Sequence, residues 1–318
     1  MYSSEIMVSV ICLAYNHEDY IRKCLEGFVM QKTDFKFEVL VHDDCSTDKT
    51  KEIIEEYAGK YSDIIVPVYE TENQHSKKVK ISRDILRPIA RGKYIAFCEG
   101  DDCWISEDKL QKQVDFLEAN PDYSCCLHCV RVVDVKTGNV SLKPNIVADK
   151  DYDIGQTLRK GILFQTSALM VRGDLWRNSP EWAYGEYSMY IYYQMCGKCK
   201  VISDTMSQYN YGTPGSWTER TKKAGFSEVK AKQTIEKLKK ANEFSEYRFN
   251  DEFTYAIRSR ECNIFVETGK IGKALCPPYS KFFLLYLKRK MASIVARKLP
   301  FVRTIKQTLE RKLHNGAR

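Results

Sequence analysis

The most informative stretch of this 318-residue chain reads Tyr94-Ile95-Ala96-Phe97-Cys98-Glu99-Gly100-Asp101-Asp102. An apolar run leads directly into a cluster of carboxylates, which predicts a buried strand that ends in an acidic loop. In open α/β sheets, ligands bind outside the carboxyl ends of the strands, and clustered acids there repel one another unless a cation or a donor-rich ligand offsets their charge. The alternative interpretation is a purely structural acidic turn before the helix that begins near Ser106.

The segments before this stretch alternate between strand and helix patterns. Strands are predicted at residues 8–13, 37–41 and 64–69, and helices at residues 20–29, 48–61 and 76–90. This alternation predicts the α/β class, with a mostly parallel central sheet that helices cover on both faces. After a helix at 107–119, strands at 123–134 and 166–171 indicate a mixed region.

Three polar loops follow successive predicted strands, so they are expected at one edge of the sheet. They are Ala14-Tyr15-Asn16-His17, Asp43-Asp44-Cys45-Ser46 and Glu99-Gly100-Asp101-Asp102. Their chemistry suits a nucleoside diphosphate, because Tyr15 can stack on a base, Asp44 can accept a hydrogen bond from it, and the third loop can bind ribose and a metal ion. Mg²⁺ or Mn²⁺ bridges carboxylate and phosphate oxygens in such sites.

These motifs together resemble a known family. Residues 8–31, the loop 42–48 and residues 92–102 look like the inverting family 2 of glycosyltransferases, and the resemblance covers about residues 6–215. It implies the GT-A fold, a nucleoside-diphosphate sugar as donor, and Mn²⁺ or Mg²⁺ as cofactor. Within it, residues 99–102 match the D-x-D-type loop of the family.

The resemblance also assigns donor-side roles. Asp44 falls on the position that contacts the nucleobase, Asp101 would hold ribose or metal, and Asp102 would hold the metal and the diphosphate. The expected nucleotide-sugar-binding residues are Ala14, Tyr15, Asn16, Asp44, Arg83, Glu99, Gly100 and Asp101. Arg83 stands where relatives carry an Arg-Asn pair and would neutralise the diphosphate, and a solvated basic helix face with the nearby lysines is the alternative.

An inverting transferase needs one general base to take a proton from the acceptor hydroxyl. The family places an Asp after a Gly at a helix start in the second half of the chain, and the match here is Gly185-Glu186. Glu186 is therefore the predicted catalytic base. The alternative is that Glu186 only favours the helix start through the macrodipole.

The acceptor side is less strongly marked. Thr166 and Ser167 resemble a Thr-Ser pair of the family, although ordinary strand polarity would also explain them. Many relatives carry a Tyr-Arg-x-His element, and the corresponding residues 209–212 contain neither the Arg nor the His. Trp217 is a further acceptor-side candidate that would compensate for their absence.

The net charge of +8 belongs to the end of the chain. Residues 280–318 hold eleven Lys or Arg and one acid, which leaves 39 bases and 41 acids in residues 1–279. We expect a GT-A domain at 1–217, a helical extension at 218–278 and a basic amphipathic tail at 279–318. Such a tail suits the anionic inner leaflet of a membrane, and packing back on the domain or nucleic-acid contact are its alternatives.

The sequence thus predicts a metal-dependent inverting glycosyltransferase that moves a sugar from a UDP-type donor to a glycan or lipid-linked acceptor in surface polysaccharide synthesis. A sugar nucleotidyltransferase and a non-catalytic carbohydrate or membrane scaffold are the rival classes. No nucleic-acid partner is expected, because residues 1–279 are net acidic. No apolar run approaches about 20 residues and no leader pattern is visible, so a cytoplasmic, peripheral location is expected. Two Cys-x-x-Cys pairs, at 126–129 and 196–199, offer a zinc site as a minor alternative.

Overall fold

The computed structural model describes residues 6–162 and 164–298, without the side chains of Trp217, Lys222 and residues 292–298. The chain divides into two compact units. The first comprises the residues up to Gly225 together with Lys240–Glu252, and the second comprises Phe226–Lys239 and the residues from Phe253 onward.

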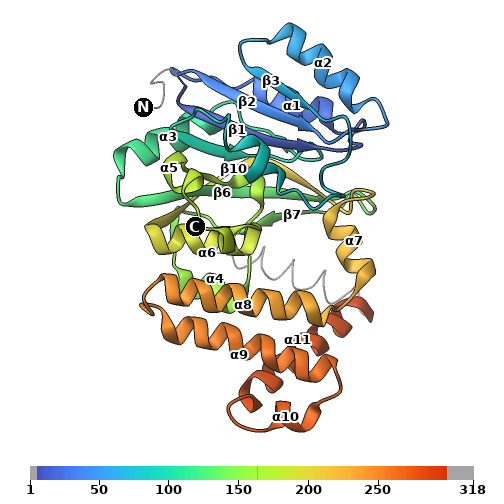
Figure 1. Ribbon diagram of the computed structural model, residues 1–318, viewed down its shortest axis with the longest axis vertical. Helices are drawn as coiled ribbons and strands as arrows, with labels where there is room; N and C mark the ends of the chain where they lie inside the picture. The colour runs from blue at the N-terminus through green and yellow to red at the C-terminus, as the bar shows by residue number, and fades with distance from the viewer. Residues whose placement is uncertain (1–5, 163, 299–318) are drawn as a thin grey trace, which may run out of the picture. The chain divides into compact units, whose positions relative to one another are not determined.

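One mixed sheet forms the first unit (Figure 1). Eight strands follow the order β3-β2-β1-β4-β9-β6-β10-β5, and β7 and β8 pair with β6 and β10. The strands are β1 (Val8–Ala14), β2 (Phe37–Asp43), β3 (Ile65–Tyr69), β4 (Tyr94–Phe97), β5 (Cys103–Trp104), β6 (Tyr123–Asp134), β7 (Val140–Lys143), β8 (Lys150–Tyr152), β9 (Met170–Arg172) and β10 (Lys198–Tyr211). Strands β1 to β4 are mutually parallel, β6 is parallel to β10, and β9 runs antiparallel between these two groups. The predicted α/β class and GT-A architecture are confirmed, with the parallel part confined to these two groups.

Alternating residues of the strands supply two cores, one on each face of the sheet. On β4, Tyr94 and Ala96 enter one core, while Ile95 and Phe97 enter the other. The first core takes α1 (Ile21–Val29), α2 (Thr50–Lys60) and α3 (Lys109–Ala119), and the second takes α5 (Gly173–Arg177) and α6 (Glu186–Cys196). Strands buried on both faces read as continuous apolar runs, which is the pattern seen in the sequence.

The helix predicted at 76–90 is wrong in extent. The structure has only the five-residue π-helix η1 (Ser82–Leu86) there. Lys78 has a positive φ of 64°, which interrupts a helix before η1. After η1, Pro88 has no N–H group with which to continue the helical hydrogen bonds.

The strand predicted at 166–171 is also wrong in its first half. Residues Thr166–Ala168 form the 3₁₀ turn η2, and β9 begins only at Met170. The carbonyl oxygens of Ser167 and Ala168 accept hydrogen bonds from the side chains of Trp104 and Gln113, and not from backbone N–H groups of a neighbouring strand. The other short elements are α4 (Ile154–Lys160), η3 (Glu181–Ala183) and α7 (Trp217–Ala224).

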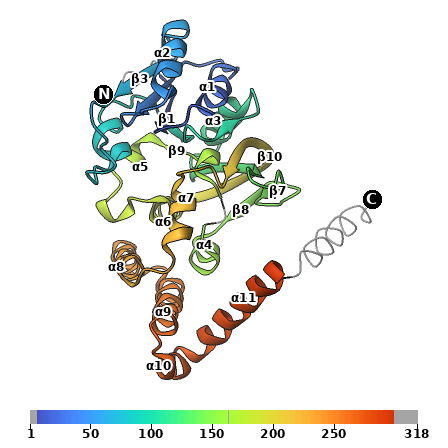
Figure 2. The same ribbon diagram turned by 90° about the vertical axis from the view of Figure 1, so that its right-hand side faces the viewer.

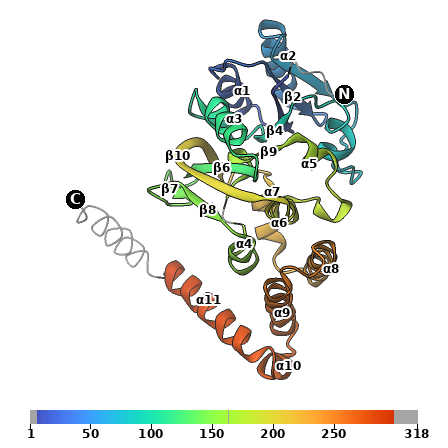
Figure 3. The ribbon, with the colours of Figure 1, turned by 90° about the vertical axis from the view of Figure 1, so that its left-hand side faces the viewer.

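Helices form all the regular structure in the described part of the second unit and its flanking residues. They are α8 (Glu228–Phe244), α9 (Asn250–Glu267), α10 (Ile271–Leu275) and α11 (Ser280–Lys298). Phe282 at the start of α11 is buried with Cys262 and Ala274 in a small core, and α11 then runs away from α10 (Figures 2 and 3). Among the described residues, no helix is both long and apolar enough to cross a membrane. The basic pairs 297–298 and 311–312 of the predicted tail lie outside the described side chains.

Candidate functional site

The loops that follow β1, β2 and β4 meet at one edge of the sheet. The Asp44 N–H donates to the Ala14 carbonyl at 3.0 Å, and the Gly100 N–H donates to the Leu13 carbonyl at 2.9 Å. A Cβ atom at position 100 would lie 2.9 Å from the His17 ring and 3.1 Å from the Ala14 Cβ. Position 100 therefore accommodates glycine only, and this close approach seats the acidic loop against the first loop.

The loop after β1 is hydrogen-bonded to the loop after β2, and it leaves the ring of Tyr15 exposed to solvent. Asn16 has a φ of 54°, and its side-chain oxygen accepts a hydrogen bond from the Thr47 N–H at 2.8 Å. The Asn16 N–H donates to the Ser46 hydroxyl at 3.0 Å. Tyr15 is 42% exposed, so its ring is accessible to a planar ligand. Asn16 is thus a structural tie between the first two loops.

Asp44 is buried and holds a segment that the sequence did not single out. Its carboxylate accepts hydrogen bonds from the Gln74 N–H at 2.7 Å and the His75 N–H at 3.1 Å, and its carbonyl accepts one from the Asn73 amide at 3.1 Å. The carboxylate therefore fixes residues 73–75 beside the first two loops. The polar run after the third strand was the only sequence signal for this segment.

The acidic loop is crowded with negative charge. Asp102 is buried, and its carboxylate accepts a hydrogen bond from the Asn210 N–H at 2.9 Å, while the Asn210 side chain donates to the Asp101 carbonyl at 2.7 Å. Burial, reinforced by the charges of Asp101 and Glu186, raises the pKa of Glu99 to about 8. Burial and the charges of Asp101 and Glu99 likewise raise the pKa of Asp102 well above its ordinary value.

Glu186 reaches this cluster from the second half of the chain. It is the first residue of α6 and follows Gly185, whose φ of 100° favours glycine. The Thr166 hydroxyl donates to the Glu186 carboxylate at 3.3 Å. Burial raises the pKa of Glu186, and a nearby lysine, Lys143, opposes that rise. Since the charge of Glu186 acts on Glu99, the base predicted from the sequence and the acidic loop belong to one site.

Lys143 was missed by the sequence analysis. It ends β7 opposite Val130 of β6, and its positive charge lowers the pKa of Glu186. The only sequence signal was its position after a turn at 136–139. The Lys143 ammonium adds a positive charge to a site whose other charged groups are mainly carboxylates.

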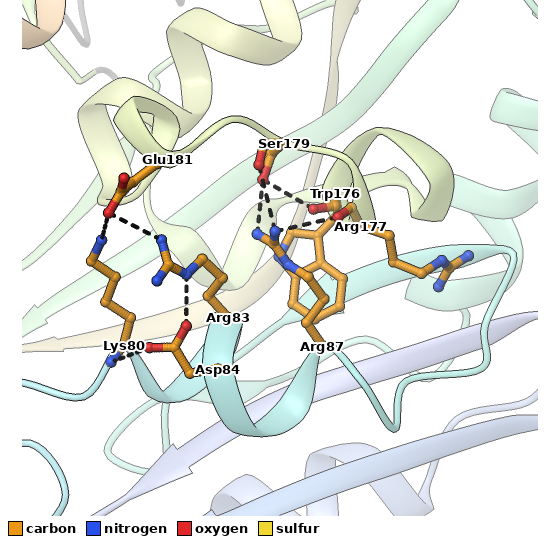
Figure 4. A network of polar contacts seen from close by, with 8 residues as sticks. All are labelled: Lys80, Arg83, Asp84, Arg87, Trp176, Arg177, Ser179 and Glu181. Atoms are coloured by element: carbon orange, nitrogen blue, oxygen red, sulfur yellow. Dashed lines mark hydrogen bonds and ion pairs between the residues drawn. The ribbon is translucent and has the colours of Figure 1, made fainter.

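Arg83 lies in a separate ion-pair network (Figure 4). Its guanidinium contacts Asp84 at 2.7 Å and Glu181 at 3.6 Å, and Lys80 contacts the same Glu181 carboxylate at 2.9 Å. These contacts join η1 to η3. The structure therefore engages Arg83 with carboxylates of its own surroundings, and the role expected for it toward a diphosphate remains a prediction.

The three acceptor-side candidates have different surroundings. The Thr166 hydroxyl donates to the Glu186 carboxylate, which places Thr166 at the site. Ser167 is fully buried, and its hydroxyl lies 3.0 Å from that of Ser207. The Ser167 side chain is therefore part of the protein interior in this structure. The backbone of Trp217 begins α7, but its side chain lies outside the described part of the chain.

The donor set fits a divalent cation that is shared with a phosphate ligand. Within the described residues, no three His, Cys, Asp or Glu side chains form a ready-made metal cage. Mg²⁺ in phosphate-binding sites is held by one or two carboxylates together with phosphate oxygens and water, so such a cage is not required. The crowded carboxylates of Asp101 and Asp102 repel each other, and a cation would relieve this repulsion.

The family assignment follows from comparison with known proteins. The model of glycosyl transferase family 2 matches residues 9–178. The chain belongs to this family, and the resemblance seen in the sequence is confirmed.

Several curated proteins are similar to this chain, and two of them are named glycosyltransferases. The uncharacterized protein Rv1520 of Mycobacterium tuberculosis is 32% identical over 213 residues, which are 66% of this chain and 60% of the relative. The Bacillus subtilis putative teichuronic acid biosynthesis glycosyltransferase TuaG is 37% identical over 35% of this chain and 42% of its own. The Escherichia coli UDP-Glc:alpha-D-GlcNAc-diphosphoundecaprenol beta-1,3-glucosyltransferase WfaP is 37% identical over 35% and 41%.

The fold is shared with TarS of S. aureus in complex with UDP-GlcNAc. The TM-score is 0.60 at 19% identity, over 81% of this chain and 73% of the solved fragment, TarS 1–349. This likeness concerns the fold alone. The chain spans about 60% of the length of the first curated relative.

Proposed function

We propose that this protein is a metal-dependent inverting glycosyltransferase that moves a sugar from a nucleoside-diphosphate sugar, UDP being the expected nucleotide, to a hydroxyl of a glycan or lipid-linked glycan. The observation that carries the proposal is that Thr166 donates to the Glu186 carboxylate beside the acidic loop, where the charge of Glu186 helps to raise the pKa of Glu99 and of Asp102. A base on one side and an acidic loop that can hold a metal ion on the other suit metal-dependent inverting transfer.

On the donor side, the exposed Tyr15 ring would stack on the nucleobase. The Asp44 carboxylate has lone pairs beyond the two bonds that it accepts, so it can take a further hydrogen bond from the base. Asp101 would contact the ribose or the metal, and Asp102 the metal and the diphosphate. Bound Mn²⁺ or Mg²⁺ would supply charge neutralisation of the diphosphate leaving group.

In the transfer step, the Glu186 carboxylate takes the proton of the acceptor hydroxyl. The acceptor oxygen forms a bond to the anomeric carbon as the bond between that carbon and the diphosphate oxygen breaks. The electron pair leaves with the nucleoside diphosphate, and attack from the opposite face inverts the anomeric configuration. The raised pKa of Glu186 suits this role because a stronger base accepts the proton more readily.

The comparisons support the substrate class. WfaP is named for a UDP-sugar donor and a lipid-diphosphate-linked acceptor, and TuaG is named for teichuronic acid biosynthesis. We therefore propose that this enzyme acts in surface polysaccharide synthesis, with an acceptor of the same general kind.

Donor hydrolysis tests this function without knowledge of the acceptor. Purified protein is incubated with Mn²⁺ and UDP-Glc or UDP-GlcNAc, and released UDP is measured. We expect release that is lost on addition of a chelator, in Asp102→Ala and in Glu186→Gln, but kept in Glu107→Gln, an exposed carboxylate outside the site. Equal release from Glu186→Gln and wild type would overturn the assignment of the base. Release of UTP in the presence of pyrophosphate would identify a nucleotidyltransferase instead.

We also propose that α11 rests on an anionic membrane surface. Leu284, Leu287 and Met291 recur at helical spacing on one face and are 60%, 40% and 65% exposed. Tyr286 and Lys290 lie on another face, where both contact Glu267 of α9. An exposed apolar stripe of this kind needs a partner.

The charge of α11 favours a lipid surface as that partner. Lys281 and Lys288 flank the apolar stripe, and the described side chains of α11 include no acid. A helix with this arrangement lies in the plane of the membrane interface, attracted by anionic headgroups. A lipid-linked acceptor would be presented at the same surface.

Sedimentation with vesicles tests this contact. We expect the protein to bind phosphatidylglycerol-containing vesicles and to bind pure phosphatidylcholine vesicles less well. The triple variant Leu284→Gln, Leu287→Gln and Met291→Gln should lose binding, while Val229→Gln on α8 should keep it. Binding by the triple variant equal to wild type would refute the proposal. Self-association of the wild type that the triple variant lacks would assign the stripe to a second copy of the chain instead.

A further inference from the structure

A buried lysine lies behind the site. Lys109, the first residue of α3, is fully buried, and its ammonium lies 4.0 Å from the centre of the Trp104 ring. The ammonium also donates to the Gln113 side-chain oxygen at 2.7 Å. No carboxylate among the described residues forms an ion pair with it. A buried charge without a counter-ion is costly, so its presence calls for an explanation.

The two groups that Lys109 contacts hold consecutive carbonyl oxygens of one short turn. The Trp104 indole N–H donates to the Ser167 carbonyl at 3.2 Å. The Gln113 amide donates to the Ala168 carbonyl at 3.0 Å and to the Cys126 carbonyl at 3.1 Å. The side chains of Trp104 and Gln113 thereby hold the 3₁₀ turn η2 from the interior, and both of them contact the Lys109 ammonium.

The opposite side of η2 faces the site. Its first residue, Thr166, donates to the Glu186 carboxylate at 3.3 Å, and a hydrogen bond from Thr166 also counteracts the rise in the pKa of Glu99. Thr166 is therefore the hydroxyl that stands between the predicted base and the acidic loop.

Trp104 also belongs to the chain segment that carries the acidic loop. It follows Asp102 by two residues and pairs with Ser207 of β10. Its ring is packed edge-on against Phe28 at 4.8 Å between centroids. A Cβ atom at Gly27 would lie 2.7 Å from the Trp104 carbonyl oxygen, so α1 packs directly on this backbone. One indole thus links the acidic loop to the turn that contacts Glu186.

We infer that Lys109, Trp104 and Gln113 are positioning residues for sugar transfer: they hold Thr166, and through it Glu186, at a fixed place against the acidic loop. The inference rests on the proposed role of Glu186 as base. A displacement of about 1 Å in such a group can lower the rate about 100-fold, so a buried support of this kind affects turnover more than donor binding.

Two variants each remove one polar group of this support. Trp104→Phe keeps an aromatic ring but removes the indole N–H, and Lys109→Met keeps chain length but removes the charge. We expect each to lower kcat for Mn²⁺-dependent UDP-sugar hydrolysis by about 10- to 100-fold, with little change in the KM for the donor. We further expect that Trp104→Phe costs little in a Thr166→Val background, because both changes break the same connection.

A matched control and a separate variant make the outcomes distinct. Trp176→Phe makes the same change at a buried tryptophan of the other core and should keep kcat. If Glu186→Gln loses activity while Trp104→Phe and Lys109→Met keep it, the positioning role is overturned and the proposed function stands. If Glu186→Gln keeps activity, the assignment of Glu186 as the base fails, and this inference loses its premise. If Trp104→Phe and Thr166→Val lower kcat additively in the double variant, the inference is also overturned. If Trp104→Phe does not fold, Lys109→Met is combined with Thr166→Val in its place.

Discussion

Asn210 holds Asp102 and its neighbour at the same time: the Asn210 N–H donates to the Asp102 carboxylate at 2.9 Å, and the Asn210 side chain donates to the Asp101 carbonyl at 2.7 Å. The sequence drew attention to residues 209–212 only for lacking the Arg and His of relatives. The structure shows that this segment orients the acidic loop. Groups that orient a metal ligand in this way often affect metal affinity as strongly as a ligand does.

Asn210→Ala should weaken Mn²⁺-dependent binding of UDP. The change removes the bond to the Asp101 carbonyl, and loss of such an outer contact typically costs about 10-fold or more in metal affinity. Calorimetric titration of UDP with and without Mn²⁺ measures the effect. Asn178→Ala, at an exposed asparagine that bonds only to the Asp174 carbonyl, serves as the control. Equal metal-dependent affinity in Asn210→Ala and wild type would contradict the role.

Tyr15→Ala should weaken UDP binding, whereas Tyr15→Phe should not. Stacking of a base on an aromatic ring contributes about 1 to 3 kcal/mol, and phenylalanine keeps the ring. Since Tyr15 is 42% exposed, neither change should alter the thermal midpoint appreciably. Fluorescence or calorimetric titration provides the affinity. A loss of affinity in Tyr15→Phe equal to that in Tyr15→Ala would assign the role to the hydroxyl and not to the ring.

Asp44→Ala should lower both stability and nucleotide affinity. The buried carboxylate accepts two backbone N–H groups, from Gln74 and His75, and leaving such groups unsatisfied costs about 1 to 3 kcal/mol. Urea unfolding and UDP titration measure the two effects. Asp63→Ala, at an exposed aspartate, is the matched control. Full stability in Asp44→Ala would show that residues 73–75 do not depend on this carboxylate.

The sequence predicted the sheet edge and its three loops because apolar runs and turn residues are local signals. The prediction of Glu186 as the base came from the family resemblance, because Gly185-Glu186 matches the Gly-Asp of the family at a helix start. Lys109, by contrast, stands near the beginning of the helix predicted at 107–119, where no local feature distinguishes it from a surface lysine. Its burial depends on Trp104 and Gln113, which come into contact with it only in the folded chain, so no local pattern indicated it.

The acceptor-side segment shows a related limit. Residues 166–171 carry a strand pattern, yet η2 replaces the first half of that strand because Trp104 and Gln113 take up its carbonyl groups. The position of Thr166 against Glu186 follows from these long-range hydrogen bonds. Sequence periodicity reports neither of them.

Activity should have an acid limb above the ordinary pKa range of a glutamate. Glu186 must be ionised to accept a proton, and burial raises its pKa, so kcat should fall as the pH is lowered through that raised value. Lys143 lowers the pKa of Glu186, whereas Lys143→Met removes this charge and should move the acid limb to higher pH. The pH profile of kcat for UDP-sugar hydrolysis measures the shift. The control is Lys198→Met, because Lys198 pairs with Asp122, and this change should leave the acid limb in place. An acid limb that does not move in Lys143→Met would contradict the assignment of Glu186 as the group that titrates.

The stability of the protein should depend on pH through Lys109. Burial lowers the pKa of Lys109 to about 7, against an ordinary value of 10.5, and the nearby titratable groups are Cys98, Cys126 and His128. Between these two values the unfolded chain binds more protons at this residue than the folded chain does, so the free energy of unfolding rises with pH, by at most about 1.4 kcal/mol per unit. Below pH 7 the lysine is charged in both states, and the full cost of burying the charge is present. Lys109→Met lacks this titration. From pH 7 to pH 9, wild type should therefore gain about 2 kcal/mol relative to Lys109→Met in urea unfolding. A difference that stays constant with pH would show that the pKa of Lys109 is not lowered and that the buried amine stays charged in the folded protein.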